Sequence, residues 1–334
     1  MPEKPLVSVV TPVYNGEDFL AECIESVLQQ TYERFEYIIV DNCSKDRTFE
    51  IALDYAKKDG RVRVHRNSEF VGVIENHNIA FRLIAADSKY CKVVCADDWL
   101  FPECIARMVS VAEANPSVGI VGSYQLSGGG SNPRHWRVRW DQIPYPSTVI
   151  PGREICRSHL LGGPYVFGDP TSTLFRADLV RAQKDFFPNS SPHADTSACF
   201  KYLCDTDFGF VHQVLSYERV HGDRQSAAAE IYNAYAPAFI NDLLAYGSYY
   251  LTEAETKKRL AEIMGYYYKF LAVGVINMRG RDFWRYHREK LNSLGYPLNH
   301  FRLMWAVLLK LIDLLLNPKR AIEALFRRAT EHRT

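Results

Sequence analysis

The chain has 334 residues, of which 47% are apolar and 24% charged, and its formal net charge is +1. This length suffices for one large α/β domain with an appendage, or for two domains. The balanced charge creates no global field that would attract nucleic acid, so we expect no nucleic-acid partner and only local electrostatic recognition.

The cysteines and the apolar segments indicate where the protein works. None of the eight cysteines forms a C-x-x-C pair, which is typical of buried thiols in the reducing cytoplasm. The opening MPEKPLVSVV contains no apolar stretch of signal-peptide length, and no segment offers the ~18 uncharged apolar residues of a spanning helix. We therefore expect a cytoplasmic protein, either free or attached to the cytoplasmic face of the membrane.

Short apolar strands alternate with amphipathic helices over the first 114 residues. The hydrophobic spacing predicts strands at 6–10, 37–40, 62–64 and 90–95, and helices at 17–30, 48–58, 74–86 and 102–114. Alternating strands and helices predict a doubly wound, mostly parallel sheet. Ligands of such sheets bind outside the carboxyl ends of the strands.

Polar residues follow three of these strands at their carboxyl ends. The first strand leads into Thr11, Pro12, Tyr14 and Asn15, the second into Asp41 and Asn42, and the fourth into Asp97 and Asp98. These exits should converge on one edge of the sheet. We therefore predict a ligand site there.

The acidic pair lies in the segment VVCADDWLFP, residues 93–102. One explanation is a helix cap, but Pro102 suits the first helical position and would place the cap near Phe101, beyond Asp98. A solvated turn is a second explanation. The third is a Mg²⁺ or Mn²⁺ site shared with a nucleoside diphosphate. The absence of GxxxxGK[ST] and GxGxxG counts against a P-loop ATPase and a dinucleotide dehydrogenase.

Four segments in order resemble the family 2 glycosyltransferases, which have the GT-A fold, over about residues 5–225. They are VSVVTPVYNGEDFLAECIESVLQQTY, YIIVDNCSKDRT, VGVIENHNIAF with Gly72 and Asn78, and VVCADDWLFP in the place of the Asp-x-Asp (DXD) motif. The resemblance implies an inverting, non-processive transferase. No Gln-x-x-Arg-Trp segment follows, which disfavours a processive synthase.

The resemblance also implies roles for individual residues. Pro12, Tyr14 and Asp41 match positions that hold the base and ribose, with Asp41 accepting a hydrogen bond from uracil. Asp98 would be the principal ligand of Mn²⁺ or Mg²⁺, and Asp97 would contact ribose or metal. The nucleotide-sugar set is completed by Thr11, Asn15, Asn42, Gly72 and Asn78. Core packing for Tyr14 and a cap on the 44–58 helix for Asp41 remain alternatives.

Two positions depart from the family's pattern. Cys95 stands where many members have the first Asp of a D-x-D-D run, so the metal site depends on the two following carboxylates. Asn42 replaces a frequent second Asp, which loosens the expected base preference.

The second half of the resembling region supplies a candidate base. Asp195, in FPNSSPHADTSACFKYL, matches the family's catalytic Asp, which takes the proton from the attacking hydroxyl, although the usual preceding Glu is missing. A helix N-cap is the alternative. In LSYERVHGDRQSA, His221 is expected near the metal or diphosphate, or else in a structural role, and Arg224 near a phosphate or exposed. Acceptor or sugar contacts are expected from Gly168, Asp169 and Thr171.

These observations give a domain scheme. Residues 1–228 form the catalytic domain, with a nucleotide-binding half at about 1–118 and an acceptor half at about 119–228, and 229–334 form a helical region. In helix 301–316 the charged residues Arg302, Lys310 and Asp313 share one narrow stripe beside a very broad apolar face. That face either packs on protein, including a second copy, or lies in the plane of the inner membrane surface.

The sequence thus predicts a metal-dependent transferase of the hexosyltransferase type. It would move a sugar from a nucleotide-diphosphate sugar, a UDP-sugar by expectation, to a hydroxyl of a surface-glycan or lipid-linked saccharide, as in polysaccharide or lipopolysaccharide biosynthesis. A nucleotidyltransferase is one alternative, although TPVYNGEDF lacks the basic residues of a phosphate loop. An inactive sugar-nucleotide-binding scaffold is the other.

Overall fold

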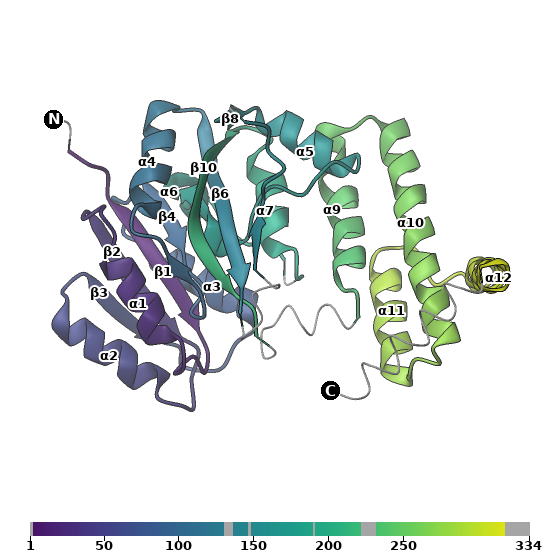
Figure 1. Ribbon diagram of the computed structural model, residues 1–334, viewed down its shortest axis with the longest axis horizontal. Helices are drawn as coiled ribbons and strands as arrows, with labels where there is room; N and C mark the ends of the chain where they lie inside the picture. The colour runs from purple at the N-terminus through teal and green to yellow at the C-terminus, as the bar shows by residue number, and fades with distance from the viewer. Residues whose placement is uncertain (1–2, 130–135, 146–147, 190, 222–231, 318–334) are drawn as a thin grey trace. The chain divides into compact units, whose positions relative to one another are not determined.

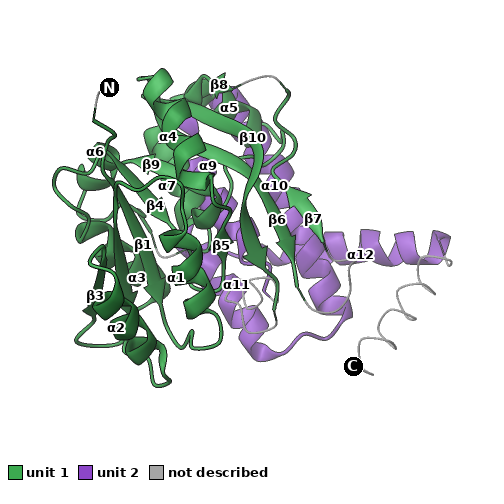
Figure 2. Cartoon of the chain, turned by 60° about the vertical axis from the view of Figure 1, so that its left-hand side comes forward, with its two compact units in different colours: residues 1–227, 249–251 green, residues 228–248, 252–334 purple. Residues whose placement is uncertain are grey.

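The computed structural model describes residues 3–129, 136–145, 148–189, 191–221 and 232–317 (Figure 1). The chain divides into two compact units, which Figure 2 colours separately: residues 1–227 with 249–251, and residues 228–248 with 252–334. The change of unit after residue 227 falls in the undescribed stretch 222–231, so the domain boundary at 228 stays a prediction.

Unit 1 is built on a sheet in the strand order β3-β2-β1-β4-β9-β6-β10-β5, with β7 beside β6 and β8 beside β10. Strands β1 to β4 and the β6–β10 pair run parallel, while β9 is antiparallel to both of its neighbours. The strands are β1 (Val7–Val13), β2 (Phe35–Asp41), β3 (Val62–Arg66), β4 (Tyr90–Val93), β5 (Trp99–Leu100), β6 (Val118–Gly128), β7 (Arg137–Arg139), β8 (Val149–Ile150), β9 (Thr173–Arg176) and β10 (Asp207–Arg219). The predicted mostly parallel α/β fold is confirmed.

Helices cover both faces of this sheet (Figure 1). On one face, α1 (Leu20–Leu28), α2 (Thr48–Lys58) and α4 (Cys104–Ala114) share a core with alternate residues of β1 and β2. On the other, α3 (Val73–Arg82) joins an aromatic cluster of Phe81, Phe175, Phe186 and Phe187. Because both faces are covered, the central strands are buried and mainly apolar.

The acidic pair is not a helix cap. The short strand β5, which the sequence pattern did not reveal, lies between Asp98 and α4. Helix α4 begins at Cys104 with Glu103 as its N-cap, so Pro102 lies two residues before the helix rather than at its first position. The two carboxylates therefore occupy a turn that follows β4.

The remaining helices of unit 1 are α5 (Gly152–Leu160), α6 (Ala177–Arg181) and α7 (Ala194–Tyr202). A 3₁₀ turn at Pro170–Ser172 leads directly into β9. The long strand β10 ends at Arg219, and its antiparallel pairing with β5 brings this end beside the acidic pair. The fold thereby joins the second half of the unit to the edge predicted from the first.

Unit 2 is helical, as predicted. It contains α9 (Tyr235–Tyr250), α10 (Glu253–Ile276), α11 (Arg281–Ser293) and α12 (His300–Leu316). A capping box between Thr252 and Glu255 starts α10. Among the described residues, no helix has the length and apolar character needed to cross a bilayer.

Candidate active site

The carboxyl ends of the first parallel strands place polar groups side by side. In the register of the sheet, Val13 at the end of β1 pairs with Asp41 at the end of β2, and Asp41 pairs with Arg66 at the end of β3. Asn42 extends this edge, since its backbone N–H donates to the Val13 carbonyl at 2.9 Å. The predicted convergence on one edge is therefore present in the fold.

Asp41 is a fully buried carboxylate with a basic partner. Its Oδ2 lies 3.2 Å from Nε of Arg66, and both carboxylate oxygens accept from the Ser44 backbone N–H at 3.3 Å. The Arg66 guanidinium lies over the Phe49 ring at 4.5 Å. Asp41 does not cap α2, whose N-cap is Arg47. The pair is thus charge-balanced, with its guanidinium exposed at the sheet edge and its carboxylate buried behind it.

Tyr14 is a surface ring rather than a core ring. It is 42% exposed and packs edge-to-face on Phe70, with the ring centroids 4.8 Å apart. Gly72 precedes α3 as its N-cap, and a Cβ at this position would meet no atom within 4 Å. The Tyr14–Phe70 pair and the uncrowded backbone at Gly72 are therefore accessible to a ligand.

Thr11 and Pro12 precede Tyr14 in the chain. Both are buried within β1, and the Thr11 hydroxyl is 2.9 Å from the Tyr37 hydroxyl in the core. Since this hydroxyl is directed into the protein, its visible role is to order the strand.

The three asparagines of the predicted set connect loops. Asn42 donates to the Val71 carbonyl at 2.8 Å and accepts from the Val71 N–H at 3.0 Å. Asn78 makes the same two-way contact with the backbone of Phe187, at 3.1 and 2.9 Å. Asn15, which has a positive φ of 49°, accepts from the Lys45 N–H at 2.9 Å. The contacts of Asn42 and Asn15 therefore fix loops at the edge, and those of Asn78 attach α3 to the segment before α7.

Asp98 is held from two directions. Its side chain is 6% exposed, and its Oδ2 accepts a 2.6 Å hydrogen bond from the Thr171 hydroxyl. Its Oδ1 accepts from the Arg219 backbone N–H at 3.1 Å. Asp97 is more open, and its Oδ2 lies 3.0 Å from Nε2 of His221. The acidic pair is thus asymmetric, with one fixed and one accessible carboxylate.

The charge balance at the pair favours a bound cation. Burial, followed by the charges of Asp97 and Asp169, raises the pKa of the Asp98 carboxyl well above its usual range. Burial, followed by the charge of Glu218, likewise raises the pKa of Asp169. The charges of Asp97 and Asp169 therefore disfavour the ionisation of the buried Asp98, and a divalent cation would remove that penalty.

The donor atoms fit a hard cation. One ligand atom each of Cys95, Asp97 and Asp98 lies within 4.8 Å of the others. Burial and the two carboxylates hold the pKa of the Cys95 thiol well above its ordinary value, so it stays a neutral thiol and a weak ligand. The carboxylate oxygens of Asp97 and Asp98 are the donors that Mg²⁺ and Mn²⁺ prefer.

Arg219 organises the pair, and sequence reasoning missed it. Besides its backbone bond to Asp98, it donates from Nε to the Asp97 carbonyl at 3.1 Å. Its guanidinium pairs with Glu22 of α1 and lies over the Phe19 ring at 4.8 Å. The sequence did contain a clue to this role, because Arg219 lies two residues before His221 in the segment LSYERVHGDRQSA, which resembles the family.

Lys92 was also missed. It is fully buried on β4, and its ammonium donates to the carbonyls of Thr171 and Thr173, the latter at 2.9 Å. Burial lowers the pKa of this amine. The sequence did contain a clue, because Lys92 is the one charged residue of a buried strand. A cation buried in this way needs acceptors such as these two carbonyl groups.

Asp195 is the second residue of α7 and not its cap, which is His193. Its Oδ1 accepts from the Thr196 N–H at 2.7 Å. The nearby Tyr165 hydroxyl donates to the Gly168 carbonyl at 2.7 Å and contacts the Thr196 hydroxyl at 3.0 Å. Burial and then the Asp195 charge raise the pKa of Tyr165 well above its usual value. The start of α7 is therefore tied to the turn before β9.

That turn contains the predicted acceptor residues. Gly168 has a φ of +88°, and a Cβ there would lie 2.3 Å from Ser172 Oγ, so only glycine fits without strain. Asp169 accepts from Ser172 N at 2.8 Å and from Gln125 Nε2 at 3.0 Å. Thr171 contacts Asp98 directly, as described above. Arg224, expected near a phosphate, lies outside the described residues.

Comparison with known proteins identifies the family. The model of Glycosyl transferase family 2 matches residues 8–182, more than half of the chain. The chain belongs to this family. Relatives include the uncharacterized glycosyltransferase EpsJ of Bacillus subtilis, 40% identical over 119 residues, or 35% of this chain and 33% of EpsJ. An uncharacterized glycosyltransferase of Rickettsia typhi, RT0329, is 27% identical over 275 residues, or 80% of this chain and 78% of the relative.

The match to EpsJ and several other curated relatives spans only about a third of their length. Two solved structures show the same fold at low identity. TarS 1-349 of S. aureus, in complex with UDP-GlcNAc, has a TM-score of 0.62 and 18% identity, covering 97% of this chain and 92% of the TarS 1-349 chain. The mannosyltransferase PcManGT of Pyrobaculum calidifontis, in complex with GDP-Man and Mn²⁺, has a TM-score of 0.53 and 16% identity, covering 93% and 88%. The predicted family and GT-A fold are confirmed.

Proposed function

We propose that this family 2 enzyme is a metal-dependent, inverting transferase that moves a sugar from a UDP-sugar to a hydroxyl of a saccharide acceptor. The observation that carries the proposal is the fixed Asp98 beside the accessible Asp97, at the sheet edge that also bears Asp41. A site for a nucleotide-diphosphate sugar needs one group that binds the base and another that neutralises the diphosphate. We assign the first role to Asp41 and the second to a cation held by Asp97 and Asp98.

The base-binding end is Asp41 with Tyr14. Asp41 can accept a hydrogen bond from the imide of uracil, while the exposed Tyr14 ring gives the base a flat contact. The open backbone at Gly72 leaves space for the nucleoside to approach. The related folds bind UDP-GlcNAc in TarS and GDP-Man in PcManGT, so the choice of uridine rests on Asp41 and its partner Arg66.

Asp97 and Asp98 would hold Mn²⁺ or Mg²⁺, and His221 would orient Asp97 or join the ligands. When bound, the cation neutralises the charge that develops on the departing diphosphate. The protein's own part is to keep Asp98 in place through Thr171 and Arg219, so that one carboxylate is already oriented before the donor arrives.

Asp195 would act as the base. Inverting transfer requires a carboxylate that takes the proton from the acceptor hydroxyl as its oxygen forms a bond to the anomeric carbon and the bond to the diphosphate breaks. Asp195 stands at the start of α7, next to the Gly168–Asp169 turn that we propose for acceptor or sugar contacts. The acceptor class we propose is a surface-glycan or lipid-linked saccharide.

Two other functions are less well supported. A nucleotidyltransferase would need a basic phosphate loop after β1, where TPVYNGEDF has neither Lys nor Arg, and family membership argues against it. An inactive binding scaffold would have no need of Asp195, or of a buried Asp98 whose ionisation is disfavoured.

The test is a donor panel. The purified chain is incubated with Mn²⁺ and with UDP-, GDP- and dTDP-sugars, and both binding and nucleoside diphosphate release are measured. We expect UDP-sugars to bind and to be slowly hydrolysed without an acceptor. If no nucleotide sugar binds, with or without metal, the proposed function is wrong.

A further inference from the structure

Helix α12 directs a continuous apolar surface outward. The exposed members of this surface, which we call the α12 arc, are between 42% and 81% exposed: Phe301, Met304, Trp305, Leu308, Leu309, Leu311, Ile312, Leu315 and Leu316. At about 100° per residue they cover an arc of about 160°, with no polar side chain among them. This arrangement reverses the usual pattern of a helix on a water-soluble domain.

Two of the three charged residues of the same helix lie away from this surface. Lys310 and Asp313 are half-buried and form a 2.9 Å ion pair, and Leu303, on the same side of the helix, is the most buried residue of α12. The start of the helix is fixed to α10, because the Asn299 N–H donates to the Tyr268 hydroxyl at 2.8 Å. Packing against α10 therefore holds the apolar arc outward.

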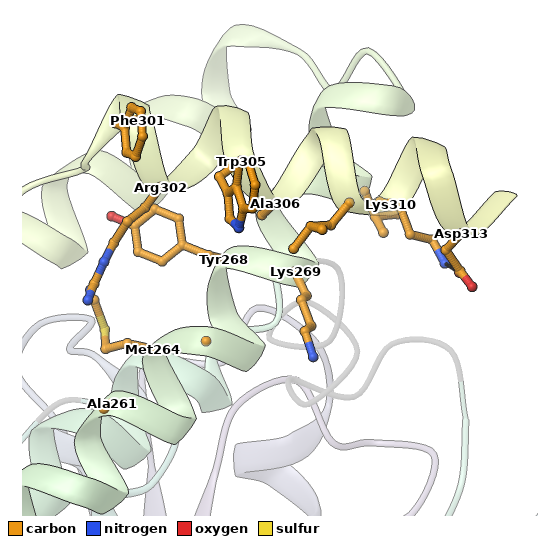
Figure 3. A pocket seen from close by; sticks show the side chains of 13 residues that line it. Ala261, Met264, Tyr268, Lys269, Phe301, Arg302, Trp305, Ala306, Lys310 and Asp313 are labelled. Carbon is orange, nitrogen blue, oxygen red and sulfur yellow. Dashed lines mark hydrogen bonds and ion pairs between the residues drawn. The ribbon is translucent and has the colours of Figure 1, made fainter. Parts of the chain in front are cut away.

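A cavity of about 690 Å³ lies between α10 and α12 (Figure 3). Its walls are mainly apolar and include Met264, Tyr268 and Val273 of α10. Trp305 and Leu309 line the cavity and also belong to the α12 arc, so the two apolar surfaces are continuous. A cavity of this size can take an alkyl chain.

Basic groups lie beside this cavity. Lys269 and Arg302 contribute to its lining, and neither forms an ion pair with a carboxylate in the part of the chain that the structure describes. The third basic residue, Lys310, is neutralised by Asp313. Two cations next to an apolar surface complement an amphiphile with an anionic head.

The composition of the arc favours a bilayer over a second protein. Protein interfaces are about 56–65% apolar and carry about ten hydrogen bonds, so polar groups surround their apolar core. The α12 arc offers no such group, and Trp305 beside two cations is typical of the boundary between lipid tails and headgroups. A helix of 17 residues with three charges is suited to lie in that boundary.

We propose that the α10–α12 face docks on an anionic lipid bilayer. Helix α12 lies in the plane of the interface, one lipid alkyl chain enters the cavity, and anionic headgroups meet Lys269 and Arg302, whose side chains lie on different sides of Tyr268 (Figure 3). This deepens the proposed acceptor class by placing the enzyme where lipid-linked saccharides reside. The docking proposal concerns residues of unit 2 only. Loss of membrane binding can therefore be told apart from loss of sugar transfer, which we assign to residues of unit 1.

Vesicle flotation of the full chain tests the proposal. We expect binding to vesicles of phosphatidylcholine with 30% phosphatidylglycerol, and at least 10-fold weaker binding to phosphatidylcholine alone. The double variant Leu308→Glu/Leu315→Glu should lose at least 10-fold in affinity, whereas Met278→Glu, at an 89% exposed position outside the arc, should bind normally. Charge reversal in Lys269→Glu/Arg302→Glu should remove the preference for the anionic vesicle.

Two further readouts separate the alternatives. Brominated lipid should quench the fluorescence of the wild type more than that of Trp305→Phe, because Trp305 borders the cavity. UDP binding should be unchanged in all of these variants. Absence of vesicle binding would overturn the proposal, as would equal binding by wild type and Leu308→Glu/Leu315→Glu. A concentration-dependent dimer that the same double variant dissociates, without vesicle binding, would assign the face to a second copy.

Discussion

The Thr171 hydroxyl donates a 2.6 Å hydrogen bond to Asp98 Oδ2, across 73 residues of sequence. The same hydroxyl accepts from the Cys95 backbone N–H at 3.0 Å. One side chain therefore fixes both the start of the acidic turn and its buried carboxylate. The turn before β9, predicted only to contact sugar or acceptor, also orients the metal ligand that we propose.

Replacement of Thr171 tests this arrangement. Thr171→Val keeps the shape but removes both hydrogen bonds, and we expect Mn²⁺-dependent UDP binding to weaken about 10- to 100-fold, the range seen when a ligand loses its orienting partner. Thr171→Ser should restore most of the affinity. Thr206→Val, which removes a 2.9 Å bond to the Tyr202 carbonyl, serves as the control. Titration calorimetry measures all three, and unchanged affinity in Thr171→Val would contradict the account.

Asp98→Asn removes the charge that we assign to the cation. We expect the metal-dependent part of UDP binding to fall by roughly 100-fold or more, because neutral amides bind Mn²⁺ far less well than carboxylates. Asp54→Asn, which removes an exposed carboxylate paired with Lys57, should behave as the wild type. Equal Mn²⁺ enhancement in Asp98→Asn and the wild type would show that the cation is held elsewhere.

Asp195→Asn separates donor binding from chemistry. The amide cannot accept the acceptor proton, so we expect transfer to fall by about 10²- to 10⁴-fold. Donor binding, measured by calorimetry, should remain within about twofold, since Asp195 lies on α7 and not at the carboxyl ends of β1 and β2. A variant with near-normal turnover would mean that another residue is the base.

Lys92→Met tests the buried cation under the turn. Methionine fills a similar volume but leaves the carbonyls of Thr171 and Thr173 without their ammonium donor, so we expect a loss of about 1–3 kcal/mol in the free energy of unfolding. Lys57→Met, an exposed counterpart, should change stability by less than about 0.5 kcal/mol. Urea unfolding gives both values. If Lys92→Met lowers the free energy of unfolding no more than Lys57→Met does, Lys92 does not stabilise the turn as we propose.

The stability of unit 2 should fall in mild acid because of His287. This buried ring contacts the Tyr267 hydroxyl through Nδ1 at 2.5 Å, and burial lowers its pKa from 6.5 to about 4. The unfolded chain therefore binds the proton more readily, and stability decreases as pH falls from about 6.5 to about 4. We expect a loss on the order of 2 kcal/mol from this group.

Thermal unfolding between pH 7 and pH 4 measures this effect. His287→Gln should flatten the dependence, since glutamine does not titrate, whereas His300→Gln at an exposed position should leave it in place. An unaltered acid dependence in His287→Gln would assign the loss to other groups.

The nucleotide half could be predicted because its signals are local. Helix α2 spans Thr48–Lys58, as its periodicity predicted, and β1 and β2 extend the predicted strands by a few residues. Alternating apolar strands and amphipathic helices leave a pattern in every short window of sequence.

The second half could not be predicted in the same way. Strands β6 and β10 pair across more than 80 residues, and β5 has two residues, too few for a pattern. The position of Arg219 depends on those pairings, and the partners of Lys92 depend on the pairing of β4 with the distant β9. Asn42 and Asn78 show another reason why site residues are hard to predict from sequence. An amide that could hydrogen-bond to a ligand can hydrogen-bond equally well to the protein backbone, as both do here.

The most direct measurement of the central claim compares UDP with UMP, each with and without Mn²⁺. If the acidic pair holds a cation for the diphosphate, Mn²⁺ should strengthen UDP binding at least 10-fold and change UMP binding little. Equal binding of the two nucleotides, or UDP binding that Mn²⁺ does not affect, would contradict the account.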